Sequence, residues 1–371
     1  MAKGGHAFFV GVAAAALSSC GGTDVVQIDQ DIVGNVYTNC SLNTSYLWVS
    51  LLQDGIPSLD NPQWDQADVE IPDYLEADMR IIGIEVVGAF LAVPHNVLWH
   101  HEIANLRWGD ERLALTYCPI TGSSLVFDRN SIGGAELGVS GVQFMGNLVM
   151  YDRRSEQSLW PQLMGEARCG GTNGTKLTQY PFVETEWASW LELHPETFVL
   201  SGAEEQGFDP TSFDYRPIGY PYFNYEEIDT WFNGLTPEVD RRLHLKERVI
   251  GLPSDSGDPG IAFPFGALEE REGSFQVVPF MFEGKGHVLL WSDEARGGTS
   301  FVPLTESGAP VSIVATSSGF EDEETRSTWT LEGRAVSGPL EGERLQRLAR
   351  THTAFWGAWA MFHPQTRLWA G

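Results

Sequence analysis

Residues 187–197 read WASWLELHPET, and residues 356–366 read WGAWAMFHPQT. Both segments carry Trp, Trp, His, Pro and Thr at identical spacing. The aromatic and histidine side chains are three and four residues apart, so they share one face of a helix, which the following proline ends. Because both segments have this arrangement, we interpret His194 and His363 as structural residues that bond locally before the Pro-x-Thr turn.

The likeness continues upstream of these two segments. Residues 158–160 (SLW) match residues 327–329 (STW), and residues 80–83 (RIIG) match residues 248–251 (RVIG). The matches keep the same order, with only small shifts in spacing, over well over a hundred residues. We therefore predict two tandem structural repeats.

Each repeat begins with an apolar, β-branched run, continues through alternating segments bounded by Gly and Asp, and ends in the Trp-rich helix. This pattern predicts a mainly β fold with a few helices, in the α+β class. The chain then divides into a lipoprotein signal peptide (1–19), a lipidated N-terminus and tether (20–55), repeat 1 (56–205), an aromatic and proline-rich crossover (206–246), and repeat 2 (247–371).

The first twenty residues have the features of a lipoprotein signal. A single lysine precedes the apolar run 7–17 (AFFVGVAAAAL), which is too short to span a bilayer. Residues 17–21 (LSSCG) look like a lipobox, so we expect Cys20 to be lipidated and to become the N-terminus. Several acyl chains on one residue give a stable anchor. We expect a cell-envelope protein that contacts the membrane through lipid and faces the periplasm or the cell exterior.

The net charge of the chain is −27. Such an acidic chain is repelled by nucleic acids and by anionic lipid surfaces, so nucleic-acid binding is excluded as a function class. The acidic excess is typical of a well-solvated surface and indicates no particular substrate.

An inward-facing histidine is predicted in repeat 1. Residues 94–105 (PHNVLWHHEIAN) read as a helix that opens with a proline. At helical spacing Val97, His101 and Ala104 share the apolar face, whereas His100 faces solvent. His101 is therefore a candidate site residue.

A cysteine lies nearby in the sequence. Residues 113–129 (LALTYCPITGSSLVFDR) read as a strand, a turn and a return strand, with Cys118 at the point where the first strand ends. The matching part of repeat 2, residues 287–302, has the strands but no cysteine. We therefore expect any site to belong to repeat 1.

The cysteine count gives one unpaired thiol. The chain has four cysteines, and lipid occupies Cys20, which leaves Cys40, Cys118 and Cys169. In an oxidising compartment we favour a Cys40–Cys169 disulfide with Cys118 free, and the other pairings stay open. A free thiol outside the cytoplasm usually binds a metal or takes part in redox chemistry.

Three hypotheses follow. In the first, His101, Cys118 and the thioether of Met150 bind copper or zinc. In the second, Cys118 is the nucleophile of a thiol enzyme with His101 as its base, and the N–H groups of Gly122 and Ser123 stabilise an oxyanion. In the third, the protein is a non-catalytic scaffold or binding protein of the envelope, with His101 and Cys118 in the core.

Several short motifs resemble the domain of unknown function 3179 family. They are HEIAN (101–105), YCPITGSSLVFDR (117–129), GVSG (138–141), NLVMYDR (147–153) and SLW (158–160). The resemblance runs from about Ile56 to the terminal Trp-rich segment and implies an exported or lipid-anchored protein without a settled activity. Some relatives have a second cysteine three positions after the first, where this chain has Thr121. The departure argues against a dithiol redox cycle within this turn.

Overall fold

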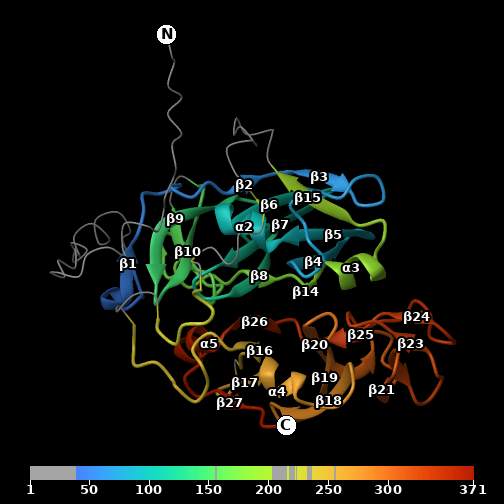
Figure 1. Cartoon of the computed structure of the whole chain (residues 1–371). Helices are drawn as coiled ribbons and strands as arrows, with labels where there is room; N and C mark the ends of the chain where they lie inside the picture. The colour runs from blue at the N-terminus through green and yellow to red at the C-terminus, as the bar shows by residue number, and fades with distance from the viewer. Residues whose placement is uncertain are drawn as a thin grey trace.

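The computed structural model describes residues 39–154, 157–202, 215–216, 222, 224–231, 236–254 and 256–371. The predicted signal peptide, the lipidation site Cys20 and much of the crossover lie outside these residues. The described chain is mainly β with a few short helices, which confirms the predicted fold class. Residues 39–202 form a first half and residues 236–371 a second half, stacked one above the other (Figure 1).

The first half contains three five-stranded sheets. In spatial order, the first sheet has β1 (Leu47–Val49), β9 (Leu137–Phe144), β10 (Asn147–Asp152), β11 (Ser158–Pro161) and β12 (Cys169–Gly170). The second has β13 (Thr178–Gln179), β8 (Ser123–Asp128), β7 (Glu111–Cys118), β6 (Ile103–Trp108) and β2 (Leu59–Asp60). The third has β14 (Val183–Glu186), β4 (Arg80–Val86), β5 (Ala89–Pro94), β15 (Phe198–Gly202) and β3 (Gln63–Gln66).

The second half contains three four-stranded sheets. In spatial order, one has β21 (Ile313–Thr316), β22 (Gly319–Asp322), β23 (Thr328–Trp329) and β24 (Ala335–Ser337). Another has β18 (Phe275–Phe282), β19 (Lys285–Ser292), β20 (Gly297–Thr305) and β25 (Leu345–Arg347). The last has β26 (His352–Phe355), β16 (Arg248–Leu252), β17 (Ile261–Pro264) and β27 (Arg367–Leu368).

The strand order of the last sheet matches that of β14, β4, β5 and β15 in the first half. In both sheets the first two pairings are antiparallel and the third is parallel. The helices of the two halves also occupy matching places after a strand. They are α2 (His95–His101) and α3 (Trp187–Leu193) in the first half, and α4 (Phe265–Glu269) and α5 (Trp356–Phe362) in the second, besides the 3-10 turns η1 (Thr44–Tyr46) and η2 (Arg129–Ile132).

Both Trp-rich helices pack in the same way against a glycine. A Cβ added to Gly83 would lie 2.3 Å from the ring of Trp190, and one added to Gly251 would lie 2.2 Å from the ring of Trp359. Only glycine leaves room for the indole at these positions. The Trp190 ring N–H donates to Thr197 Oγ1 at 2.9 Å, and the ring of Trp359 makes the equivalent bond in the second half.

The histidines of these helices are buried or partly buried, as structural residues are. His194 is the C-cap of α3: its N–H donates to the carbonyl oxygen of Trp190, and its own carbonyl oxygen accepts from Thr197 N–H. Its side chain also reaches the second half, where Nε2 lies 2.8 Å from Glu332 Oε2. The ring of His363 packs on Trp359. The local bonds of the His194 backbone agree with the structural role expected for it, and its side chain adds a contact across the boundary between the halves.

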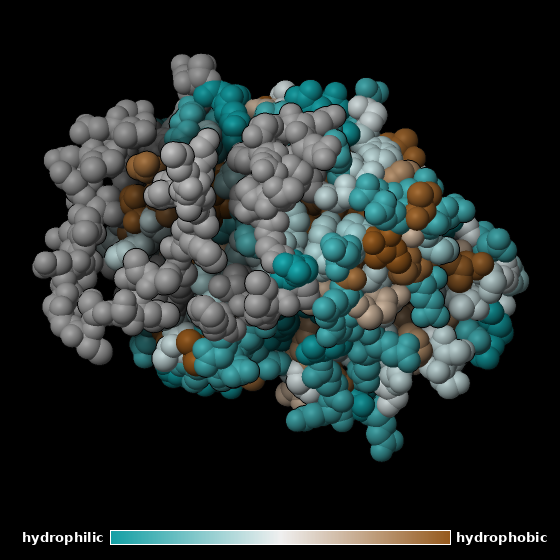
Figure 2. Space-filling view, turned by 45° about the horizontal axis from the view of Figure 1, so that its top comes forward, coloured by the Kyte–Doolittle hydropathy of each residue, from teal (hydrophilic) through white to brown (hydrophobic). Residues whose placement is uncertain are grey.

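Part of the segment predicted as a tether belongs to the fold. Residues 47–49 form β1, which pairs with β9, and a disulfide joins Cys40 to Cys169 in β12. The thiol of Cys118 is free and buried. In the described part of the chain, no helix has the length and apolar character needed to cross a bilayer. On the face drawn in Figure 2, the described surface is mostly hydrophilic, with apolar residues in small groups, as the charge pattern indicates.

Candidate functional site

The helix that carries His101 is shorter than predicted. It ends at His101, because Glu102 adopts a left-handed backbone conformation (φ 57°) and the chain then enters β6. Ala104 therefore lies in a strand and not on the helix. His101 is fully buried, as expected, and the sequence error concerns only where the helix stops.

The two ring nitrogens of His101 are both hydrogen-bonded. Nδ1 lies 2.8 Å from the carbonyl oxygen of Pro57, and Nε2 lies 2.6 Å from the hydroxyl of Tyr215. A carbonyl only accepts, so Nδ1 carries the proton and Nε2 accepts from the tyrosine. Burial lowers the pKa of His101 to about 4, so the ring is neutral at physiological pH. These contacts are those of a structural residue: each ring nitrogen is directed to a hydrogen-bond partner, and neither is directed to a metal or a thiol.

Cys118 ends β7, as predicted, and is buried. Leu148 N–H donates to its sulfur at 3.4 Å, and the thiol lies 3.7 Å from the carbonyl oxygen of Gly146. Thr121 also hydrogen-bonds to Cys118. Burial, together with the nearby charge of Glu102, raises the pKa of Cys118 to about 11. At neutral pH the thiol is therefore protonated.

The turn after Cys118 faces the second half of the molecule. Phe355 N–H donates to the carbonyl oxygen of Thr121, and the Phe355 ring lies against Gly122, where a Cβ would be 2.8 Å from it. The Thr121 hydroxyl lies 2.7 Å from the Ser123 hydroxyl, inside a buried polar network. The turn is thus covered on one side by the ring of Phe355.

The proposed metal ligands do not form a metal centre of the expected kind. Within the described ranges, no group of three or more His, Cys, Asp and Glu side chains is arranged to hold an ion. Met150 is buried in β10 and belongs to the same apolar cluster as Cys118. Both ring nitrogens of His101 are engaged by Pro57 and Tyr215, so these contacts lend no support to a joint site of His101 and Cys118, which stays a prediction.

Glu102, which the sequence analysis did not single out, lies beside Cys118 instead. Its backbone carbonyl accepts from Tyr117 N–H at 2.8 Å, which places it next to the end of β7. Glu102 and Cys118 both line a narrow cavity of about 60 Å³, together with Tyr222 and Leu148. Burial raises the pKa of Glu102 to about 8. Glu102 follows His101 directly in the sequence. A prediction that the helix ends at His101 would have been needed to place the Glu102 side chain near Cys118.

A larger pocket of about 470 Å³ lies between the two halves, and we call it the inter-half pocket. Its walls come from α2 and the start of β4 in the first half, and from the start of β16 and from α4 in the second. Four cationic and four acidic side chains line it, namely Arg80, Lys246, Arg248, Arg296, Asp78, Glu226, Glu247 and Glu269. Its volume lies within the range of small-molecule binding sites.

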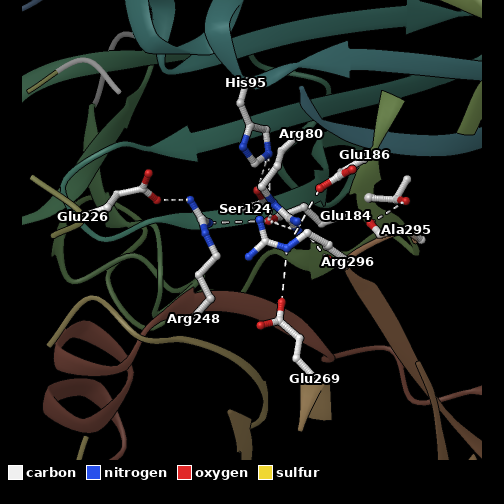
Figure 3. Close-up of polar contacts among 11 residues, drawn as sticks. Arg80, His95, Ser124, Glu184, Glu186, Glu226, Arg248, Glu269, Ala295 and Arg296 are labelled. Carbon is white, nitrogen blue, oxygen red and sulfur yellow. Dashed lines mark hydrogen bonds and ion pairs between the residues drawn. The ribbon is translucent and has the colours of Figure 1, made fainter. Parts of the chain in front are cut away.

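Two arginines at matching positions of the two halves meet at this pocket. Arg80 begins β4 and Arg248 begins β16 (Figure 3). Both point to Glu184 of β14: Arg80 Nη2 lies 2.6 Å and Arg248 Nη1 lies 3.8 Å from Glu184 Oε1. Burial of Glu184 opposes its ionisation, yet the positive charges of Arg80 and Arg248 prevail and lower its pKa to about 2. One carboxylate therefore balances part of the charge of two guanidinium groups.

Further partners surround this centre. Arg248 Nη2 donates to Glu226 Oε1 at 2.6 Å, and Arg296 lies 3.2 Å from Glu269 (Figure 3). His95 lies 3.1 Å from the Ser124 hydroxyl, and burial lowers its pKa to about 3. His95 is thus a neutral hydrogen-bonding group.

None of these pocket residues was predicted from the sequence as a site residue. Arg80 had been aligned with Arg248, and that alignment was the signal that could have found them. Shared residues were interpreted as structural, so the two arginines were not treated as candidates. The two arginines approach each other only because of the way the two halves pack, and a comparison of sequence motifs does not predict that packing.

Comparison with known proteins gives a family and no activity. A family model described as "Protein of unknown function (DUF3179)" matches residues 53–366. No curated protein and no solved structure matches the chain. The match covers most of the sequence and confirms the resemblance found from the motifs. The chain therefore belongs to the DUF3179 family of proteins of unknown function.

Proposed function

We propose that this protein is a lipid-anchored, extracytoplasmic binding protein that takes up a small zwitterionic solute, such as an amino acid, in the inter-half pocket. The observation that carries the proposal is the convergence of Arg80 and Arg248 on the single buried carboxylate of Glu184. The proposal develops the third hypothesis, that of a binding protein. It places the binding site at the boundary between the halves and not at His101 and Cys118.

The floor of the pocket suits an anionic group. Glu184 is a fixed partner, because its side chain is only 2% exposed. Glu226, the second partner of Arg248, has a side chain that is 40% exposed. An acidic group of a ligand can replace Glu226 on Arg248 without uncovering a buried charge, and guanidinium groups bind carboxylates in a bidentate manner.

The rest of the pocket suits a cationic or donating group. Asp78, Glu247 and Glu269 lie on its wall with the arginines. Equal numbers of acidic and basic side chains disfavour a simple polyanion, whose second charge would meet these carboxylates. A molecule with one acid and one amine satisfies both sets of charges.

Two features support an extracytoplasmic location. The lipobox-like segment at residues 17–21 provides an anchoring cysteine, Cys20. The Cys40–Cys169 disulfide suits an oxidising compartment, where such bonds persist. A test is to replace Cys20 with Ser: incorporation of labelled palmitate should stop and the protein should leave the membrane fraction. Continued membrane association of the variant would contradict the anchor.

The binding test uses the full mature chain and a panel of common amino acids, their N-acetyl derivatives and their amides. We expect one or more free amino acids to raise the melting temperature, because a ligand at about a hundred times its Kd adds about 2.7 kcal/mol to stability. The N-acetyl and amide forms, which lack one charge each, should bind at least about tenfold more weakly. Titration calorimetry then gives the Kd.

Variants at the pocket distinguish this site from any other. Arg248→Gln should weaken binding at least about thirtyfold, since it removes one member of a desolvated charge pair. Glu226→Gln should tighten binding about fivefold, because it removes the competing carboxylate. Arg326→Gln, at an arginine that is 67% exposed, changes the net charge equally and should have no effect. Unchanged affinity of Arg248→Gln, or no binding by any amino acid, would refute the proposal.

A further inference from the structure

The narrow cavity beside Cys118 is separate from the inter-half pocket. Successive residues of a strand point to opposite faces of the sheet. Accordingly, Tyr117 of β7 lines the inter-half pocket, and the next residue, Cys118, lines the narrow cavity. No residue lines both. The chemistry of the narrow cavity therefore needs its own explanation.

Glu102 is the unusual group in this cavity. The residue is only 7% exposed. Its side chain lines the cavity, and no basic side chain among the described residues forms an ion pair with it. Burying a carboxyl group without a basic partner is unfavourable, so purely structural positions rarely keep one. The group faces the same space as the free thiol of Cys118.

The cavity admits only very small molecules. About 60 Å³ is room for a few water-sized molecules and for no organic substrate of ordinary size. The backbone N–H of Leu148, 3.4 Å from the sulfur, is a donor that would stabilise a developing thiolate. A buried thiol, a proton acceptor and a fixed N–H donor thus surround a space of the size of hydrogen peroxide.

We propose that Cys118 and Glu102 form a peroxide-reactive site in which Glu102 is the base. In the fraction of molecules whose Glu102 is ionised, a fraction that grows as the pH rises through neutrality, its carboxylate accepts the proton of the thiol, and the sulfur attacks one oxygen of hydrogen peroxide. A sulfur–oxygen bond forms as the oxygen–oxygen bond breaks. The leaving hydroxide takes the proton from Glu102 and departs as water, while Cys118 becomes a sulfenic acid. Sulfur is oxidised by two electrons and the peroxide is reduced by two.

The sulfenic acid has no resolving thiol among the described residues. Cys40 and Cys169 are joined to each other, and Thr121 stands where some relatives have a second cysteine. The oxidised state of Cys118 is therefore long-lived in the folded protein, and an external reductant returns it to the thiol.

The experiment measures oxidation of Cys118 in the folded, disulfide-bonded protein. The protein is treated with hydrogen peroxide, quenched, and unfolded in the presence of a dimedone probe, which is too large to enter the native cavity. Mass spectrometry then quantifies the labelled peptide. We expect hydrogen peroxide to label Cys118 at least about a hundredfold faster than cumene hydroperoxide does, whereas after unfolding the two oxidants should act at similar rates.

Variants test the role of the carboxyl group. Glu102→Gln should slow oxidation at least about tenfold, the loss expected for a general base, and Glu102→Asp should restore part of the rate. Glu111→Gln, at the opposite end of β7, should oxidise like the natural protein. Equal rates for Glu102→Gln and the natural protein would overturn the role of Glu102. Equal rates for the small and the large peroxide in the folded state would overturn the site itself.

Discussion

Replacing Glu102 with Gln should stabilise the protein near neutral pH, although it removes a buried ionisable group. Burial raises the pKa of Glu102 to about 8, whereas its ordinary value is 4.5. Between these values the folded state holds a proton that the unfolded state has lost, so stability falls as the pH rises from 4.5 to 8. Each pKa unit corresponds to about 1.4 kcal/mol, which gives a penalty on the order of 3 kcal/mol at pH 7. Gln has nearly the same shape and carries no such penalty.

The assay is chemical denaturation of the natural protein and of Glu102→Gln at pH 4.5, 6, 7 and 8. The difference in unfolding free energy should be close to zero at the lowest pH, grow through neutrality and level off above pH 8. The nearby groups do not reverse the sign: Cys118 and Tyr222 have raised pKa values and stay neutral over this range. Parallel curves for the two proteins, or a constant loss of stability in the variant, would refute the reasoning.

Three further predictions concern packing, covalent linkage and pH. Gly83→Ala should lower the unfolding free energy by at least about 2 kcal/mol, because its methyl group would overlap the ring of Trp190, whereas Gly286→Ala, with open space around it, should change little; denaturant midpoints compare the two. Opening the Cys40–Cys169 disulfide by double replacement with Ser should lower stability by about 5 kcal/mol, since it closes a loop of 129 residues, and an unchanged melting temperature would contradict this. Burial lowers the pKa of His95 to about 3, so the unfolded state alone gains its proton below pH 6.5; stability should fall by about 1.4 kcal/mol per pH unit there, and His95→Asn should remove that slope.

Features that depend only on neighbouring residues could be predicted from the sequence alone. The Trp-rich segments form helices that end before the proline, and Cys118 lies at the end of a strand before a tight turn, as the patterns predicted. The mainly β class and the family also followed from alternation and motifs. Each of these depends on neighbouring residues, whose geometry is set by backbone preferences.

Features that depend on long-range contacts could not be found in the same way. The helix at residues 95–101 stops one turn early because Glu102 turns the chain into β6, which pairs in parallel with β2, a strand far back in the chain. That single turn directs His101 to Pro57 and brings the Glu102 carboxyl group to Cys118. Hydrophobic periodicity continued smoothly through this point and gave no sign of the break.

The inter-half pocket illustrates the same limit. Arg80 and Glu184 lie on the paired strands β4 and β14 of the first half, and the packing of the two halves brings Arg248 of β16 to them. Residues shared by two repeats are usually structural, yet here the shared arginines converge because the halves face each other. The two tandem repeats stay a prediction. One sheet of each half has the same order of strands, and Arg80 and Arg248 begin corresponding strands of these sheets.

The most direct test of the proposed function is a crystal structure of the protein with a bound amino acid from the binding panel. We predict that the carboxylate of the ligand lies within hydrogen-bond distance of Arg80 or Arg248, that Glu226 has moved away from Arg248, and that the amine faces Asp78 or Glu269. A ligand bound elsewhere on the molecule, or a ligand in the pocket with the Arg248–Glu226 pair intact and the carboxylate directed away from both arginines, would contradict the account.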